Sequence, residues 1–132
     1  MKFMLMMNAP RGNGDWGVEQ WPVADLQAHI AFMMDFAAQL QKSGELVAAE
    51  GLASPGEARV VRVGDGGAPE VTDGPFAETK EFLAGFWIVD CDSRERVYAI
   101  AAQASSAPGP GGAPLRIPIE VREVMSAPPV EG

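Results

Sequence analysis

The sequence predicts a single α+β domain, and three observations lead to this fold class. Apolar runs of strand length open the chain and recur along it, a long amphipathic helix follows the first run, and a second helical pattern precedes the last strand. Strands and helices in this order favour a ferredoxin-like βαββαβ plan with an extra hairpin. Such a domain is an antiparallel sheet that carries both helices on one face.

The first half of the chain reads as strand, helix and strand. Residues 3–7 are a continuous apolar run with the length of a central strand. Residues 21–43 predict a long helix, because Pro22 suits a first turn and Gly44 fits the position just past the end. Strand character resumes over residues 45–52.

The long helix carries one apolar stripe at helical period. Its members recur at steps of four, three, four and three residues, and they are Leu26, Ile30, Met33, Ala37 and Leu40. Phe32 and Phe36 widen the stripe into a broad face. We therefore expect the helix to bury this face against the sheet.

The second half predicts the hairpin, a strand, a helix and a last strand. The expected elements are a half-exposed strand at 59–63, a short returning strand at 70–72, one helical turn at 79–83, a strand at 86–91, a helix from about 93 to 104 and a last strand at 116–121. Asp92 or Ser93 is expected to cap the second helix. Pro118 indicates that the last strand lies at an edge of the sheet.

Length, composition and charge limit the function. The chain has 132 residues, of which 47% are hydrophobic, so residues 1–125 can form one domain and residues 126–132 a tail. The net charge of −8 argues against partners such as nucleic acid or an anionic membrane surface. Cys91 is the only cysteine; it suits a reducing cytoplasm and is expected to be a buried thiol. The sequence contains no stretch of about 18 apolar residues, so no membrane span is expected.

One face of the predicted sheet has no helix to cover it. An apolar open face of a twisted sheet commonly meets a partner, so we expect a homodimer that packs sheet against sheet with two-fold symmetry. The candidates for this face are Met4, Met6, Met7, Trp87 and Val89.

Residues 73–81 read Asp-Gly-Pro-Phe-Ala-Glu-Thr-Lys-Glu and form the most informative motif. Asp73, Gly74 and Pro75 predict a rigid turn, because Gly accepts a positive φ and Pro fixes φ near −65°. The turn presents a carboxylate beside further charged groups. It is either a plain hairpin connection or part of a functional site.

The chain resembles a known family through this motif. The block from Asp73 to Phe76, followed by Glu78-Thr79-Lys80-Glu81 and Gly85-Phe86, resembles the DGPF-type branch of the YCII-related (YciI-like) family. Further matches are Lys2-Phe3-Met4-Leu5-Met6, Gly44-Glu45-Leu46-Val47, Glu50-Gly51-Leu52 and Ile117-Pro118-Ile119-Glu120-Val121-Arg122. The likeness covers most of residues 1–125 and implies a dimeric α+β barrel of ferredoxin-like halves.

The resemblance implies small-molecule chemistry without naming a reaction. YciI-like proteins are suspected enzymes, with a histidine on the first helix and an aspartate proposed as a catalytic pair, and a few relatives act on small cyclic compounds. The family's histidine would fall near Met33, whereas the only histidine here is His29, one helical turn earlier. His29 could point into a pocket or lie at the edge of the apolar stripe in contact with solvent.

The candidate catalytic residues are Asp73, Glu50 and His29. Asp73 is the first choice as general base or ligand-orienting carboxylate, and Glu50, near the end of a strand, could face the same cavity. Further expected ligand contacts are Gly74, Pro75, Phe76, Glu78, Lys80 and, in a predicted loop at 8–17, Trp16. Glu78 and Lys80 could instead be a solvated pair, and the aromatic residues could pack in the core. One histidine, one cysteine and no paired spacing predict no metal, and the Gly-rich stretches match no cofactor-binding loop.

Two functions follow as hypotheses. The first is a small cytoplasmic homodimer that binds a small organic molecule, as a cofactor-free lyase or isomerase. The alternative is a non-enzymatic accessory module that works with an extracytoplasmic-function sigma factor, since genes for DGPF-type proteins often lie beside such factors. The acidic surface suits a basic protein partner better than DNA.

Overall fold

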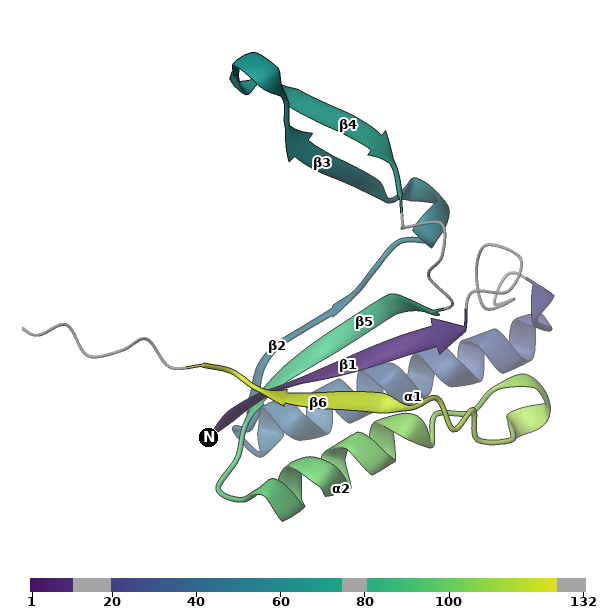
Figure 1. The fold of residues 1–132 in the computed structure, drawn as a ribbon. Helices are drawn as coiled ribbons and strands as arrows, with labels where there is room; N and C mark the ends of the chain where they lie inside the picture. Colours follow the sequence, from purple (N-terminus) through teal and green to yellow (C-terminus); the bar gives the residue numbers. More distant parts are fainter. Residues whose placement is uncertain (11–19, 75–80, 126–132) are drawn as a thin grey trace, which may run out of the picture.

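The chain folds into a four-stranded antiparallel sheet with two helices on one face and a separate projecting hairpin (Figure 1). The computed structural model describes residues 1–10, 20–74 and 81–125. The elements are β1 (Lys2–Pro10), α1 (Val23–Lys42), β2 (Leu46–Gly51), β3 (Arg59–Val63), β4 (Pro69–Asp73), β5 (Glu81–Asp90), α2 (Arg94–Ser105) and β6 (Ile119–Glu123). Short 3₁₀ turns occupy Pro55–Glu57, Asp65–Gly67 and Pro110–Gly112.

The strand order of the main sheet is β2-β5-β1-β6, and every neighbouring pair is antiparallel. The predicted α+β class is confirmed, and this order is compatible with the ferredoxin-like plan. β3 and β4 pair only with each other, and Figure 1 shows them standing away from the main sheet. The inserted hairpin between β2 and β5 therefore leaves the four-stranded sheet uninterrupted.

The core lies between the sheet and the helices. Alternate residues of β1 point toward the helices, and Phe3 and Leu5 are almost fully buried there. Their register partners on β5 are Val89 and Trp87, which share the same face. Phe36 of α1 packs edge to face on Trp87, with ring centroids 5.4 Å apart.

The open face of the sheet differs from the prediction. Met7, Trp87 and Val89 were expected on it but belong to the buried core, because they share the parity and register of Phe3 and Leu5. The open face instead presents the alternate set, which consists of Met4, Met6, Phe86 and Ile88 and is only partly buried. Both described helices lie on the opposite face of the sheet (Figure 1).

Helix α1 buries a slightly different stripe from the one predicted. The buried residues are His29, Phe36 and Leu40, while Ile30 is 48% exposed. The stripe is thus rotated by about one residue, which moves His29 into the packed side of the helix. The helix ends at Lys42, and Gly44 lies just past its end, as expected, with a φ of 80°.

Several strand limits also differ from the prediction. β1 continues through Pro10, so its last residues were wrongly assigned to a loop. Residues 81–83 begin β5 instead of completing the helical turn predicted at 79–83, because they pair with the far end of β1. β6 starts at Ile119, just after Pro118, and lies at an edge as predicted. Ser93 caps α2 by accepting a hydrogen bond from the backbone N–H of Arg96.

Candidate functional site

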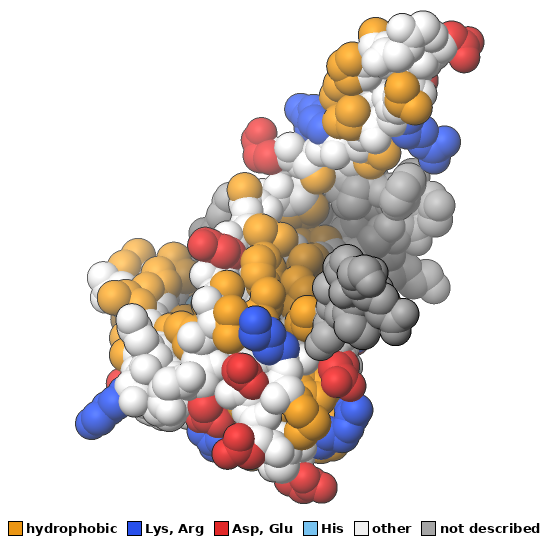
Figure 2. All heavy atoms as spheres, turned by 90° about the vertical axis from the view of Figure 1, so that its left-hand side faces the viewer, with side chains coloured by type: hydrophobic (Ala, Val, Ile, Leu, Met, Phe, Trp, Pro, Cys, Tyr) orange, Lys and Arg blue, Asp and Glu red, His pale blue; other side chains and the backbone are white. Residues whose placement is uncertain are grey.

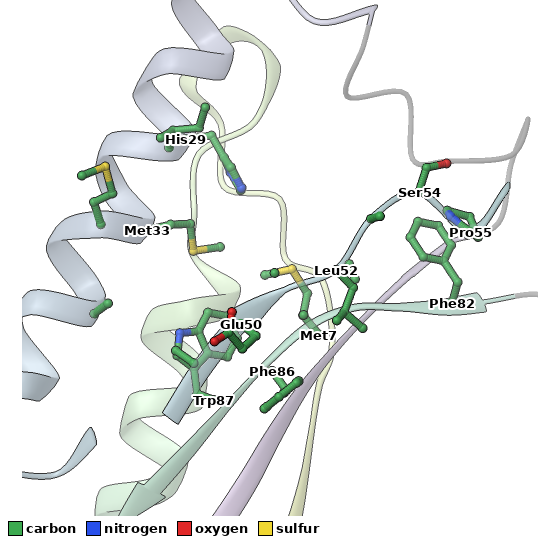
Figure 3. Close-up of a pocket in the computed structure, with 18 residues that line it drawn as sticks. Met7, His29, Met33, Glu50, Leu52, Ser54, Pro55, Phe82, Phe86 and Trp87 are labelled. Carbon is green, nitrogen blue, oxygen red and sulfur yellow. The ribbon is translucent and has the colours of Figure 1, made fainter. Parts of the chain in front are cut away.

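A cavity of about 550 Å³ opens between α1 and the β2–β5 edge of the sheet (Figure 3). Helix α1 lines it with His29, Ile30, Met33, Met34 and Ala37; β1 with Met7; β2 and the segment after it with Ala49, Glu50, Gly51, Leu52, Ala53, Ser54 and Pro55; and β5 with Phe82, Ala84, Gly85, Phe86 and Trp87. This volume is in the range of pockets that hold small organic ligands.

Most of the lining is apolar and flexible. In Figure 3, Met33 points from α1 toward the sheet, and Met7 and Trp87 point from the sheet toward the helix. Ile30 and Met34 are 48% and 70% exposed, so the apolar side of α1 that is not used in the core faces this cavity. Methionine side chains adapt to ligands of different shape, and the cavity therefore suits an apolar body rather than a fully polar one.

His29 is the best anchored polar group of the pocket. Its side chain is directed from α1 into the space between helix and sheet, and it is 8% exposed. Nδ1 lies 3.0 Å from the carbonyl oxygen of Pro108, and the ring packs edge to face on Trp21 at 5.5 Å. Because a carbonyl only accepts, Nδ1 carries a proton and donates it in this hydrogen bond. The sequence left open whether His29 points into a pocket or lies in contact with solvent, and in the structure His29 lines the pocket.

Glu50 and Ser54 are the other polar side chains among the described lining residues. Glu50 lies on the edge strand β2, is exposed, and pairs in register with Phe86. The Ser54 hydroxyl accepts a hydrogen bond from the backbone N–H of Gly56 at 3.4 Å, which caps the 3₁₀ turn that follows β2. Glu50 is therefore the single carboxylate-bearing residue among the described residues that line this cavity.

Asp73 lies outside the pocket. It ends β4 on the projecting hairpin, its side chain is 96% exposed, and its carboxylate is 3.6 Å from Nε of Arg59. Gly74 follows it, and its N–H donates to the carbonyl of Ala58 at 3.0 Å, which closes the base of the hairpin. The structure of one chain therefore brings His29 and Glu50 to one cavity and keeps Asp73 away from it.

The other predicted ligand contacts fall on residues that the structure does not describe. These are Trp16, Pro75, Phe76, Glu78 and Lys80. Gly74 is described, and it does not line the cavity. For the motif at residues 73–81, only its first two residues and its last residue can therefore be placed.

Sequence reasoning missed the methionine-rich wall of the pocket, although a signal for it was present. His29 precedes Met33, Phe36 and Leu40 by 4, 7 and 11 residues, which is the spacing of one helix face. Met33 also lines the cavity, and it is the position near which the family resemblance expects a histidine. Choosing this spacing instead of the one through Ile30 would have placed His29 correctly.

Other kinds of site find no support in the part of the chain that is described. No three His, Cys, Asp or Glu side chains there are arranged to hold a metal ion. None of the described helices combines the length and the apolarity needed to span a bilayer.

The fold and the pocket define a class of protein, a small α+β domain with a ligand-sized cavity between its first helix and the sheet edge. The model of the YCII-related domain family matches residues 1–112. The chain belongs to the YCII-related family. An uncharacterized protein of Rhizobium meliloti (strain 1021) is 51% identical over 37 residues, which cover 28% of this chain and 30% of that protein. The chain thus matches less than a third of the length of this relative.

Proposed function

We propose that this YCII-related protein binds a small organic molecule with an apolar body in the cavity between α1 and the β2–β5 edge. The observation that carries the proposal is the composition of the wall, in which apolar side chains surround three polar groups, His29, Glu50 and Ser54. A few fixed polar groups in an apolar cavity are the usual pattern of a small-molecule site, since they orient a ligand that apolar contacts hold.

The chemistry that fits this pocket is proton transfer without a cofactor, as in a lyase or isomerase. His29 is held in one orientation by the Pro108 carbonyl, and an imidazole ring is the side chain that most often transfers protons in enzymes. Glu50 supplies a carboxylate on the same cavity. Asp73 enters this proposal only through a second chain, because its own chain holds it outside the pocket.

We further propose that the protein works as a homodimer built on the open face of the sheet, the arrangement of a dimeric α+β barrel. Met4, Met6, Phe86 and Ile88 form an apolar centre on this face. By register, Glu120 and Arg122 of β6 continue the rows of Met6 and Met4. A face with an apolar centre and both signs of charge at its margin can pair with a copy of itself.

A thermal-shift screen tests the ligand proposal. The wild-type chain is screened against small aromatic and aliphatic acids, amines and neutral compounds, together with Ala37→Phe, which places a bulky ring in the cavity from α1. A ligand at a hundred times its Kd adds about 2.7 kcal/mol to the free energy of unfolding. We expect wild type and Asp73→Asn to shift equally and Ala37→Phe to lose the shift.

The outcomes separate the alternatives. Equal shifts for wild type and Ala37→Phe would place the ligand elsewhere and overturn the proposed site. A shift that disappears only in Asp73→Asn would return the site to the hairpin. For any ligand that binds, exchange of its carbon-bound protons in D₂O tests the proton-transfer chemistry, and His29→Gln should slow this exchange while the ligand still binds.

A second candidate function is kept because of one observation. Asp73 stands in solvent on the same hairpin as three exposed valines, which is the surface expected of an accessory module that docks on another protein, such as a sigma factor. A chain that stays monomeric and binds no compound of the screen would favour this function over the first.

A further inference from the structure

Of the strand pairs that the structure describes, the hairpin of β3 and β4 is the most exposed to solvent. Every residue of β4 is exposed, and β3 has only Val60 partly buried. The hairpin leaves the domain at one point, where the N–H of Gly74 meets the carbonyl of Ala58. A two-stranded hairpin is marginally stable in water by itself, so an extended one of this kind needs a surface to pack on.

One face of the hairpin is apolar throughout its middle. Val61 pairs directly with Val71, and Val63 pairs with Pro69, so these four side chains share one face. Val61 and Val71 are each 59% exposed, and Val63 is 78% exposed. The other face carries the pairs Arg62–Glu70 and Val60–Thr72. This alternation is typical of a strand pair with one buried and one solvated face.

We propose that the hairpin is a dimerisation arm, whose apolar face of Val61, Val63, Pro69 and Val71 packs against a second copy of this chain at the margin of the two open sheet faces that meet in the homodimer. The proposal extends the homodimer of the preceding subsection, and it does not depend on the ligand pocket. In Figure 1 the arm stands away from the sheet of its own chain. Its three valines are exposed to solvent.

The complementary surface is present on the same chain. Met4, Met6, Phe86 and Ile88 are partly exposed on the open face of the sheet. Figure 2 shows hydrophobic side chains on the projecting arm and gathered again on the body of the molecule below it. In an isologous dimer the contact between arm and sheet face forms twice, because each copy supplies one arm and one sheet face.

The charges also favour a second copy over an unrelated acidic or basic surface. The chain carries a net charge of −8, yet residues 59–73 hold two basic and three acidic side chains and are nearly balanced. The arm is thus the segment that approaches an acidic copy with little repulsion. Arg122, in register with Met4, provides a basic group on the sheet face. The apolar face of the arm ends in the pair of Arg59 and Asp73, which carries both signs of charge.

This dimer would give Asp73 a new environment. Asp73 follows Val71 by two residues and therefore points to the same face of the arm. Packing of that face on a second chain moves the carboxylate from solvent into the interface. Ser54 and Pro55, which line the pocket, lead directly into β3, so the arm and the pocket share a stretch of chain.

Sedimentation velocity over a range of protein concentrations tests the arm. The test variant is Val61→Thr/Val63→Thr/Val71→Thr, since threonine keeps the shape and the strand propensity of valine but adds a hydroxyl. The matched control is Arg62→Thr/Glu70→Thr, which changes a cross-strand pair on the opposite face and keeps the net charge. We expect the valine variant to dimerise at least about tenfold more weakly than wild type and the control to match wild type.

A second variant guards against local misfolding of the arm. Ala58 and Gly74 are already joined by a 3.0 Å hydrogen bond, so an Asn-Gly turn can replace residues 59–73 without stretching the chain. This variant should keep the circular dichroism spectrum expected for the main sheet and helices, and it too should dimerise more weakly than wild type. The arm is refuted if both variants dimerise like wild type, if the control weakens equally, or if wild type is monomeric throughout. A ligand shift retained in the weakened dimers would show that the pocket proposal stands independently.

Discussion

Glu45 is the residue whose ionisation is most strongly tied to the fold. Arg96 donates to it from Nε at 2.9 Å and from Nη2 at 2.8 Å, and Ser43 donates to it at 2.7 Å. The hydrogen bonds from Arg96, then that from Ser43, lower the pKa of Glu45 from 4.5 to about 2. The ion pair joins the start of β2 to the first turn of α2 and so fixes one end of the domain.

We predict that Glu45→Gln destabilises the protein in a pH-dependent way. Because the pKa of Glu45 is lower in the folded state, its stabilising contribution is fully present above its ordinary value of 4.5 and is lost as the pH falls toward 2. The variant should lose about 1–2 kcal/mol of unfolding free energy at about pH 6, and less at about pH 3. Urea unfolding of both proteins at these pH values measures the difference. A difference that does not shrink at the lower pH would contradict the assignment.

Cys91 is predicted to be an unreactive thiol. It is 3% exposed, and its Sγ donates to Glu45 at 3.4 Å. Burial first, and then this hydrogen bond to a carboxylate, raise the pKa of Cys91 from 9.0 to about 11. At about pH 8 the folded protein should therefore hold about a hundredfold less thiolate than the unfolded chain. Alkylation by iodoacetamide should be slower by at least this factor in the native protein, and equal rates with and without denaturant would refute the prediction.

The pairing of β2 with β5 is the element contact that most directly shapes the pocket. A Cβ added at Gly85 would lie 2.9 Å from the carbonyl oxygen of Glu50, which is backbone and cannot move aside alone. Gly51 lies opposite Gly85 in register, and a Cβ there would meet nothing within 4 Å. The glycine on β5 is therefore required for the close approach of the edge strand, whereas the glycine on β2 is not.

Gly85→Ala should push β2 away from β5 and lower the free energy of unfolding by about 1–3 kcal/mol. Gly51→Ala is the matched control, and it should change stability by no more than about 0.5 kcal/mol. Urea unfolding gives both values, and hydrogen exchange of the Leu52 amide, which bonds the Ala84 carbonyl at 2.9 Å, reports on the edge pairing. If both variants behave alike, the close approach does not limit the packing of this strand.

For the whole molecule, the net charge of −8 opposes self-association while the apolar surfaces favour it. We predict that the proposed dimer tightens when salt is raised from about 20 mM to about 200 mM, because screening weakens the repulsion between two acidic copies. Sedimentation at the two ionic strengths measures the dissociation constants. A dimer that weakens with salt would instead be held mainly by ion pairs across its interface.

Much of the architecture was predictable because it depends on local patterns. Alternation over residues 59–63 predicted a half-exposed strand, which forms but is exposed at every residue except Val60, and the glycine at position 44 predicted the end of α1. Errors arose where one pattern fits two arrangements. Residues 81–83 were placed in a helical turn because their pairing with β1, across some 70 residues of chain, is not visible in their own composition.

The candidate site was predictable only in part. His29 and Glu50 were named from the sequence and line one cavity, but the cavity itself depends on how far α1 stands from the β2 edge. Asp73 was named from its turn, and the turn belongs to a hairpin that leaves the domain. No local rule tells whether a rigid turn faces a pocket or solvent, since that depends on the direction in which the hairpin projects.

The order of residues alone dictates which side chains share a face, since strands alternate and helices repeat every 3.6 residues. It thereby indicates the helices, most of the strand positions and the class of fold. Which face meets the helices is decided by long-range register, and this put Met7, Trp87 and Val89 in the core and left Met4 and Met6 outside. The pocket, and the position of Asp73 outside it, likewise exist only once distant segments have packed, because burial is a property of the folded chain.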